Sequence, residues 1–133
     1  MKRIFKKMVA SVMAVTTLAV GMTGFSASAV EARYGGSGTF TVNGVSVNKS
    51  IDGYKSSAGG STSCNSTLCN WVYVSVSGYY SNSQFYTEDD YATRGSVSVG
   101  FPAETGRKFI KVMSYHSATI SGINGTDEMT VIL

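Results

Sequence analysis

Few residues in this chain could carry acid–base or metal chemistry. Its 133 residues include one histidine, His116, and two cysteines, Cys64 and Cys69. Any histidine-dependent catalysis must therefore use His116, and none of the many serines lies in a G-x-S-x-G nucleophile motif. A C-x₄-C pair with one histidine elsewhere is a weak signal for a metal site. We therefore expect no enzyme activity, no cofactor and no metal site.

Charge is also scarce. Charged residues make up 14% of the chain, and four of its 11 basic residues, Lys2, Arg3, Lys6 and Lys7, lie at the N-terminus. The remaining sequence has seven basic and eight acidic residues, a net charge near −1. Proteins bind nucleic acids and anionic membranes through clustered excess positive charge. We therefore expect no nucleic-acid partner, and contact with a membrane only during export.

The N-terminal residues have the layout of a secretory signal peptide. An apolar run, Met8 to Phe25, follows the basic start and leads to Ala27-Ser28-Ala29, an A-x-A cleavage site. Val30-Glu31-Ala32 is a second acceptable site, and glycines within the run make it a poor permanent membrane span. We predict that residues 1–29 are removed and that residues 30–133 form one secreted domain. The short, lysine-led start is typical of bacteria. A signal peptide followed by a Ser/Gly/Tyr/Val-rich β-domain resembles small exported proteins of Gram-positive bacteria, so we expect a Gram-positive source.

Beyond residue 29 no segment has helical periodicity, and the patterns are those of strands. The most regular stretch runs from Trp71 to Tyr80, with Val72, Val74 and Val76 in strict alternation. Successive side chains of a strand point to opposite faces, so this pattern places the valine side in a core. We predict that it forms the central strand of an antiparallel sheet.

Three dipeptides favour tight hairpins: Asn43-Gly44, Asp52-Gly53 and Asn124-Gly125. Such pairs adopt the positive φ angles that two-residue hairpin turns require. Each turn would place apolar side chains on one face. The pairings expected are Val42 with Val45, Phe40 with Val47, Ile51 with Tyr54, Ile120 with Met129, Ala118 with Val131 and His116 with Leu133.

The remaining segments complete a β-rich pattern. Ser56 to Ser66 predicts a loop, and Ser81 to Thr93 a polar, irregular segment. Gly95 to Phe101 predicts a strand that ends at the single proline, and Arg107 to Ser121 a long strand with a bulge or bend near Ser114. Together these patterns predict an all-β fold: a small antiparallel two-sheet β-sandwich of about six to eight strands, with a small barrel as second choice.

The two cysteines are separated by four residues. A secreted chain with two cysteines most simply pairs them, so we predict a disulfide between Cys64 and Cys69. A ring this short would stabilise the fold by about 2 kcal/mol, enough to fix a loop.

Aromatic residues supply the main candidate for a ligand site. Five of them, Tyr79, Tyr80, Phe85, Tyr86 and Tyr91, lie within thirteen residues, and Trp71 and Tyr73 lie just before them. Flat amphipathic rings stack on sugars or anchor protein partners, although they also serve simply as core packing. We expect the five rings to gather at one end or edge of the sandwich, with at least two partly exposed.

Three acidic residues, Glu88, Asp89 and Asp90, lie among these aromatics. They could accept hydrogen bonds from the hydroxyl groups of a ligand. A calcium site is less favoured, because strict neighbours cannot all point at one ion without a sharp turn. The sequence therefore predicts a small exported, non-catalytic binding module for a cell-surface glycan or protein.

Two other functions stay open. The segments His116-Ser117-Ala118-Thr119-Ile120 and Tyr80-Ser81-Asn82 resemble lactococcin-972-type bacteriocins, which are small secreted β-sandwiches, and this resemblance implies a toxin against competing cells. In that family a long aromatic-rich part follows the histidine strand, whereas thirteen residues follow Ile120 here, and no functional residue is carried over. The other alternative is a small secreted hydrolase using His116. We favour a structural histidine, half-buried in a strand and bonded to the backbone.

Overall fold

The structure is a computed structural model that describes residues 34–133, and these residues form eight strands and no helix. The strands are β1 (Tyr34–Val42), β2 (Val45–Tyr54), β3 (Ser57–Cys64), β4 (Cys69–Tyr79), β5 (Phe85–Ala92), β6 (Gly95–Pro102), β7 (Lys111–Ile120) and β8 (Ile123–Ile132). The predicted signal peptide and both cleavage sites lie outside the described residues. Within residues 34–133 no helix long and apolar enough to cross a membrane is found.

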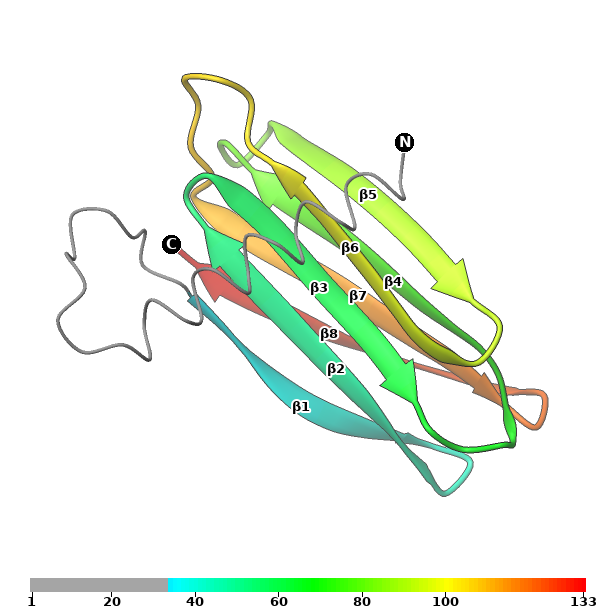
Figure 1. Cartoon of the computed structure of the whole chain (residues 1–133). Coiled ribbons are helices and arrows are strands. Elements are labelled where there is room, and N and C mark those ends of the chain that lie inside the picture. Colours follow the sequence, from blue (N-terminus) through cyan, green and yellow to red (C-terminus); the bar gives the residue numbers. More distant parts are fainter. Residues whose placement is uncertain (1–33) are drawn as a thin grey trace, which may run out of the picture.

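The strands form two antiparallel sheets that pack face to face (Figure 1). Their strand orders are β1-β2-β3-β6 and β5-β4-β7-β8. Contacts between the layers join β1 to β8, β2 to β7, β3 to β4 and β6 to β5, so the two sheets are aligned. The predicted two-sheet sandwich is therefore confirmed for the described residues.

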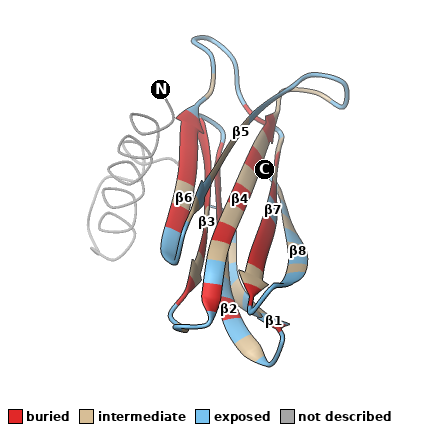
Figure 2. Cartoon of the chain, turned by 90° about the vertical axis from the view of Figure 1, so that its right-hand side faces the viewer, coloured by how far each residue is buried: buried red, intermediate tan, exposed pale blue. Residues whose placement is uncertain are grey.

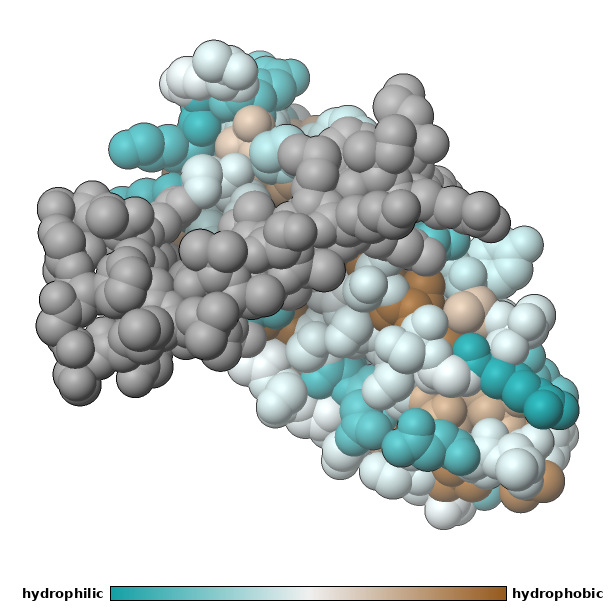
Figure 3. Space-filling view, viewed as in Figure 1, coloured by the Kyte–Doolittle hydropathy of each residue, from teal (hydrophilic) through white to brown (hydrophobic). Residues whose placement is uncertain are grey.

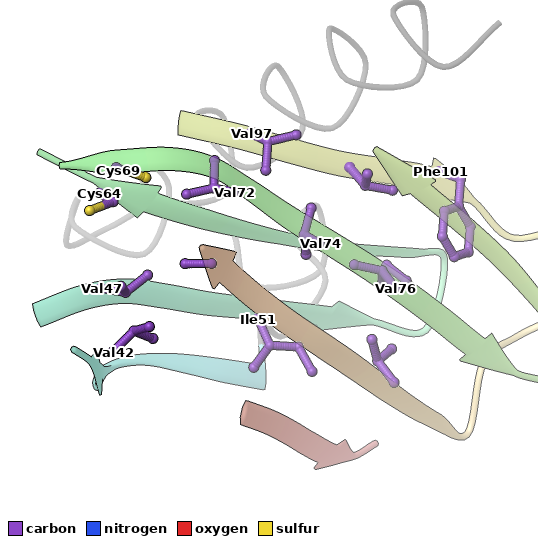
Figure 4. Packing of buried hydrophobic residues seen from close by; sticks show 14 of the residues in the cluster. Val42, Val47, Ile51, Cys64, Cys69, Val72, Val74, Val76, Val97 and Phe101 are labelled. Atoms are coloured by element: carbon purple, nitrogen blue, oxygen red, sulfur yellow. The ribbon is translucent and has the colours of Figure 1, made fainter. Parts of the chain in front are cut away.

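The core lies between the sheets and is built from alternating residues of each strand. Val72, Val74 and Val76 are fully buried, and the banding of β4 in Figure 2 shows the alternation. Figure 4 shows these valines packed against residues from the other sheet, such as Val97 and Phe101. Each fully buried side chain of this size stabilises the fold by about 1.5–3 kcal/mol. β4 lies between β5 and β7, as expected of a central strand.

The first hairpin has the predicted turn and register. Asn43 and Gly44 adopt φ angles of 48° and 77°, and Val42 pairs with Val45. Phe40 pairs with Val47, so the apolar side chains of both strands face the core.

The second predicted turn, Asp52-Gly53, is wrong. These two residues continue β2, the chain turns at Lys55 and Ser56, and Ile51 pairs with Gly60 of β3. Gly53 lies in a tightly packed position, because a Cβ atom there would lie 3.0 Å from a Leu133 methyl carbon.

The loop predicted at Ser56–Ser66 is also wrong, because most of it is strand β3. At Gly60 a Cβ atom would meet a Val76 methyl carbon at 2.9 Å. The small residues of β3 therefore allow the two sheets to approach closely, and they do not mark an irregular segment.

Ser81–Thr93 was likewise expected to be irregular, yet β5 covers most of it. A short turn precedes β5, in which the Tyr80 N–H donates to the Gln84 carbonyl at 2.8 Å. β5 is an edge strand, so its polar residues face solvent rather than indicate a loop. The strand predicted from Gly95 is confirmed as β6.

The last hairpin differs from the prediction in its turn and its register. β7 begins only at Lys111, and its pairing with both neighbours continues through Ser114 without a bulge there. The turn is Ser121-Gly122, with φ angles of 50° and 80°, so Ile120 pairs with Ile123 and His116 with Asp127. Gly125 again provides space, since a Cβ atom there would lie 2.4 Å from a Val42 methyl carbon.

Candidate functional site

The outer faces of the two sheets differ in character. On the β1-β2-β3-β6 sheet the outward positions are mostly small and polar, and much of the surface in Figure 3 that is not grey is correspondingly pale. Two of these residues, Ser50 and Ser61, share a hydrogen bond of 2.6 Å across β2 and β3. The outer face of the other sheet carries large aromatic side chains.

Three aromatic residues meet on that outer face. Trp71 and Tyr73 alternate with the buried valines of β4, and Tyr73 pairs directly with Tyr91 of β5. Together with Asn70 and Thr93 they line a cavity of about 440 Å³, which we call the aromatic groove. Tyr91 is 66% exposed and therefore presents most of its ring to solvent.

The rings of the aromatic groove are held from several sides. Trp71 and Tyr73 pack edge to face with centroids 6.2 Å apart, and Tyr73 packs similarly on Tyr115 at 6.1 Å. The Tyr73 hydroxyl donates to the Asp89 carboxylate at 3.1 Å. These contacts restrict the rings of Trp71 and Tyr73, so the β4 side of the groove is preorganised for a ligand.

The opposite end of β5 holds the other predicted aromatics. Tyr80, Phe85 and Tyr86 line a second cavity of about 370 Å³ together with Ser83, Gln84, Glu104 and Arg107, and we call it the end pocket. Tyr79 lies beside it, packed on Phe85 with centroids 5.1 Å apart. The structure thus brings four of the five predicted rings to one end and places Tyr91 at the other.

The three acidic residues lie on strand β5. Asp89 points to the outer face, whereas Glu88 and Asp90, opposite Val76 and Val74, point to the inner side at the edge of the sheet. The Tyr86 hydroxyl donates to Glu88, and this bond, with partial burial, raises the pKa of Tyr86 to about 12. Because consecutive carboxylates alternate, they do not converge on one ion. Residues 34–133 contain no cluster of three or more His, Cys, Asp or Glu side chains able to hold a metal.

His116 is fully buried between the sheets, more deeply than expected. Its Nδ1 atom lies 2.8 Å from Thr62 Oγ1 and its Nε2 atom 2.7 Å from Ser114 Oγ. Thr62 donates to the Tyr73 carbonyl at 2.9 Å, so Nδ1 carries the ring proton and Ser114 donates to Nε2. Both ring nitrogens thus have a side-chain hydroxyl as partner, in addition to a weaker interaction with the backbone of Ser61. Burial, and next the charge of Lys49, lower the pKa of His116 to about 4.

The contact between Ser114 and His116 has the geometry of a nucleophile and its base, but it is closed to substrate. Ser114 is 2% exposed and His116 is not exposed at all. The group that orients the imidazole is the neutral hydroxyl of Thr62, where hydrolytic triads place a carboxylate or amide. In this structure the three side chains form a polar connection between the two sheets.

The predicted disulfide is wrong: Cys64 and Cys69 are both free, buried thiols. They lie side by side at the end of β3 and the start of β4 (Figure 4), where each packs in the core as a small apolar group. The Cys69 thiol contacts the Trp71 carbonyl at 3.7 Å, next to a register shift in β4. Burial, with additional effects of Cys64, raises the pKa of Cys69 to about 11.

One ion pair joins the two sheets at their side. Lys49 of β2 bonds Asp127 of β8, and the Lys49 side chain is only 13% exposed. The bond to Lys49 holds the pKa of the Asp127 carboxyl below its usual value.

Some residues of these sites were not identified from the sequence. Glu104 and Arg107 of the end pocket come from the segment between β6 and β7, which the sequence indicates only as a turn followed by a strand. No local motif distinguishes them. They become part of the pocket because residues 103–110 fold back beside the β4–β5 turn, where the Ile110 N–H donates to the Tyr79 carbonyl at 2.7 Å.

Comparison with known proteins does not identify a family for this chain. No protein-family model matches the chain, and no significant similarity is found to a curated protein or to a solved structure.

Proposed function

We propose that the protein is an exported, non-catalytic binding module that takes a neutral cell-surface glycan in the aromatic groove. The observation that carries this proposal is the arrangement of Trp71, Tyr73 and Tyr91 around one open cavity of about 440 Å³ on a sheet face. Flat aromatic rings offer large contact areas to the apolar faces of sugar rings and lose little conformational entropy on binding.

The polar groups of the groove favour a neutral ligand. No charged side chain lines the groove, and the Asp89 carboxylate beside it accepts a hydrogen bond from Tyr73. Asn70 lies at the rim, where its Oδ1 accepts the Gly122 N–H at 2.9 Å, so the side chain is fixed. Its amide and the Thr93 hydroxyl supply the kind of uncharged hydrogen-bonding groups that orient a ligand in a mostly apolar site.

Buried placement of Ser114 and His116 gives no support to the alternative of a hydrolase. A hydrolase would need both side chains within reach of substrate and water, whereas both lie inside the core. The binding proposal requires no movement of the core.

Glycan-array screening of the purified protein, followed by calorimetry with the best neutral oligosaccharide, tests the proposal. We expect Tyr91→Ala to weaken binding about tenfold or more, because truncation of a central aromatic anchor costs more than about 1 kcal/mol. Ile132→Ala is the matched control, because Ile132 is 69% exposed on the same sheet face but far from the groove. Failure to bind any neutral glycan, or equal losses in both variants, would contradict the proposal.

A further inference from the structure

The end pocket is a second cavity, separated from the aromatic groove by the length of β5. It forms where the turn between β4 and β5 meets the segment 103–110 between β6 and β7, and Figure 1 shows both segments at the same end of the sandwich. Its lining differs from that of the groove because it contains a cation, Arg107, and a carboxylate, Glu104.

Arg107 is held in one orientation by its neighbours. Its guanidinium carbon lies 3.8 Å from the centroid of the Tyr80 ring. One terminal nitrogen donates to Gln84 Oε1 at 2.7 Å and the other to Glu104 Oε2 at 3.1 Å. A guanidinium has five N–H groups in a planar fork, so a fixed arginine can still offer paired donors to a further carboxylate or phosphate.

The ring beneath Arg107 is fixed as well. Tyr80 stacks on the buried Phe109 with centroids 4.8 Å apart, and its hydroxyl accepts the Glu104 N–H at 2.9 Å. Phe109, Tyr80 and Arg107 therefore form a continuous stack that runs from the core to the surface. Such preorganisation lowers the entropy cost of binding a ligand.

Positive charge is concentrated at this end. Four of the six basic residues within residues 34–133 lie here: Lys55, Arg107, Lys108 and Lys111. The Phe109 N–H donates to the Lys55 carbonyl at 2.8 Å, which brings the β2–β3 turn to residues 103–110. Lys111 lies over the Tyr79 ring at 4.2 Å. The opposing carboxylates are Glu104, which lines the pocket, and Glu88, which accepts a hydrogen bond from the Tyr86 hydroxyl. The total charge is near neutral, although basic residues outnumber acidic ones at this end of the sandwich.

Two exposed rings flank this charge. Phe85 is 57% exposed and Tyr86 is 42% exposed, and both line the end pocket. We propose that the end pocket binds an acidic sugar, whose carboxylate or phosphate bonds Arg107 while its ring packs against Phe85 and Tyr86. In the free protein the Glu104 carboxylate pairs with Arg107 in the position that this anion would take. Glu104 is exposed, and surface ion pairs of this kind are weak, so an incoming anion replaces it readily.

Calorimetry with three probes tests the proposal: trigalacturonic acid, galactose 6-phosphate and neutral galactotriose. We expect at least one acidic probe to bind, with an affinity that falls as salt is added, and galactotriose to show no binding that depends on Arg107. The acidic probe that binds identifies the anion as carboxylate or phosphate. Absence of binding by both acidic probes would overturn the proposal.

Two variants should change the affinity for the acidic probe in opposite directions. Arg107→Gln should weaken binding of the acidic probe about tenfold or more, because it removes a charge-assisted hydrogen-bonded pair. Glu104→Gln should strengthen binding of the acidic probe about two- to fivefold, because the substitution removes the carboxylate that competes for Arg107. Equal affinities in wild type and both variants would refute the site. Tyr91→Ala should leave acidic binding unchanged, so this proposal and the one for the aromatic groove succeed or fail separately.

Discussion

Acidification from pH 7 to pH 5 should destabilise this protein through one residue, His116. The imidazole is buried, neutral and hydrogen-bonded on both nitrogens. Its pKa falls from an ordinary value of 6.5 to about 4 on folding. Between these two values the unfolded chain binds a proton that the folded protein does not, so stability rises with pH. The contribution of His116 is therefore complete above about pH 6.5 and is lost as the pH falls toward 4.

The magnitude follows from the size of the pKa change. One pKa unit corresponds to about 1.4 kcal/mol, so the full effect is about 3 kcal/mol once both states are protonated. About 2 kcal/mol of this is expected between pH 7 and pH 5. That loss is a large fraction of the roughly 5–15 kcal/mol that stabilises a typical domain.

Urea unfolding followed by the fluorescence of the single tryptophan measures the effect at pH 7, 6 and 5. Asp127 does not interfere, because its lowered pKa gives stability that is lost only as the pH falls through its ordinary value of 3.8. His116→Gln provides the comparison, since the amide can hydrogen-bond but does not titrate. We expect a steep pH dependence in the wild type and a shallow one in the variant. Parallel slopes, or a histidine pKa near 6.5 by NMR, would refute the reasoning.

Three other outcomes are expected. Gly78→Ala should lower the free energy of unfolding by about 1–3 kcal/mol, because the new Cβ atom would lie 2.5 Å from a ring atom of Phe109. Gly36→Ala is the control, because a Cβ atom there meets open space and should change the free energy little. Similar denaturation midpoints for the two variants would contradict this prediction. Asp127→Asn should cost about 1–2 kcal/mol by urea unfolding, because it leaves the mostly buried Lys49 without its carboxylate, and an unchanged midpoint would argue against the pair. The raised pKa of Cys69 predicts that iodoacetamide labels this thiol at pH 8 at least about tenfold more slowly in the folded protein than in the urea-unfolded protein. If the unfolded protein takes up no label unless it is first reduced, the two cysteines form a disulfide and the free thiols are refuted.

The sequence predicts the fold class well because alternation is a local pattern. The valines of β4 and the Asn43-Gly44 turn lie where their residue types indicate, since nothing distant overrides them. The dipeptides at Gly53 and Gly125 look the same locally but lie within strands. At both positions a side chain distant in sequence lies 3.0 Å or less from where a Cβ atom would be. Tertiary packing favours glycine at these positions, and a single sequence does not display that packing.

The same reason limits prediction of the sites. Clustering of aromatics along the chain suggested one site, yet a strand of eight residues separates its two ends, so Tyr91 and Tyr86 line different cavities. Charge shows a similar limit, because counting residues cannot reveal that Lys55 and Arg107 lie at one end. The buried partners of His116 come from β3 and from its own strand, and only the packing of the two sheets brings them together.

The strand order also determines when this chain can fold. Ser57 of β3 pairs with Pro102 of β6, and Trp71 of β4 pairs with Thr119 of β7, so each sheet is completed by a strand that comes more than forty residues later. Contacts this distant in sequence place a β-sandwich among the slower two-state folders, with folding times of about milliseconds to seconds. As the chain emerges, the meander of β1 to β3 has no cover for its apolar face until β4 and β7 are both available. Folding is therefore a late and collective event, because a chain that ends before β7 lacks two of the four strands of the second sheet and leaves β1 and β2 without the strands that cover them.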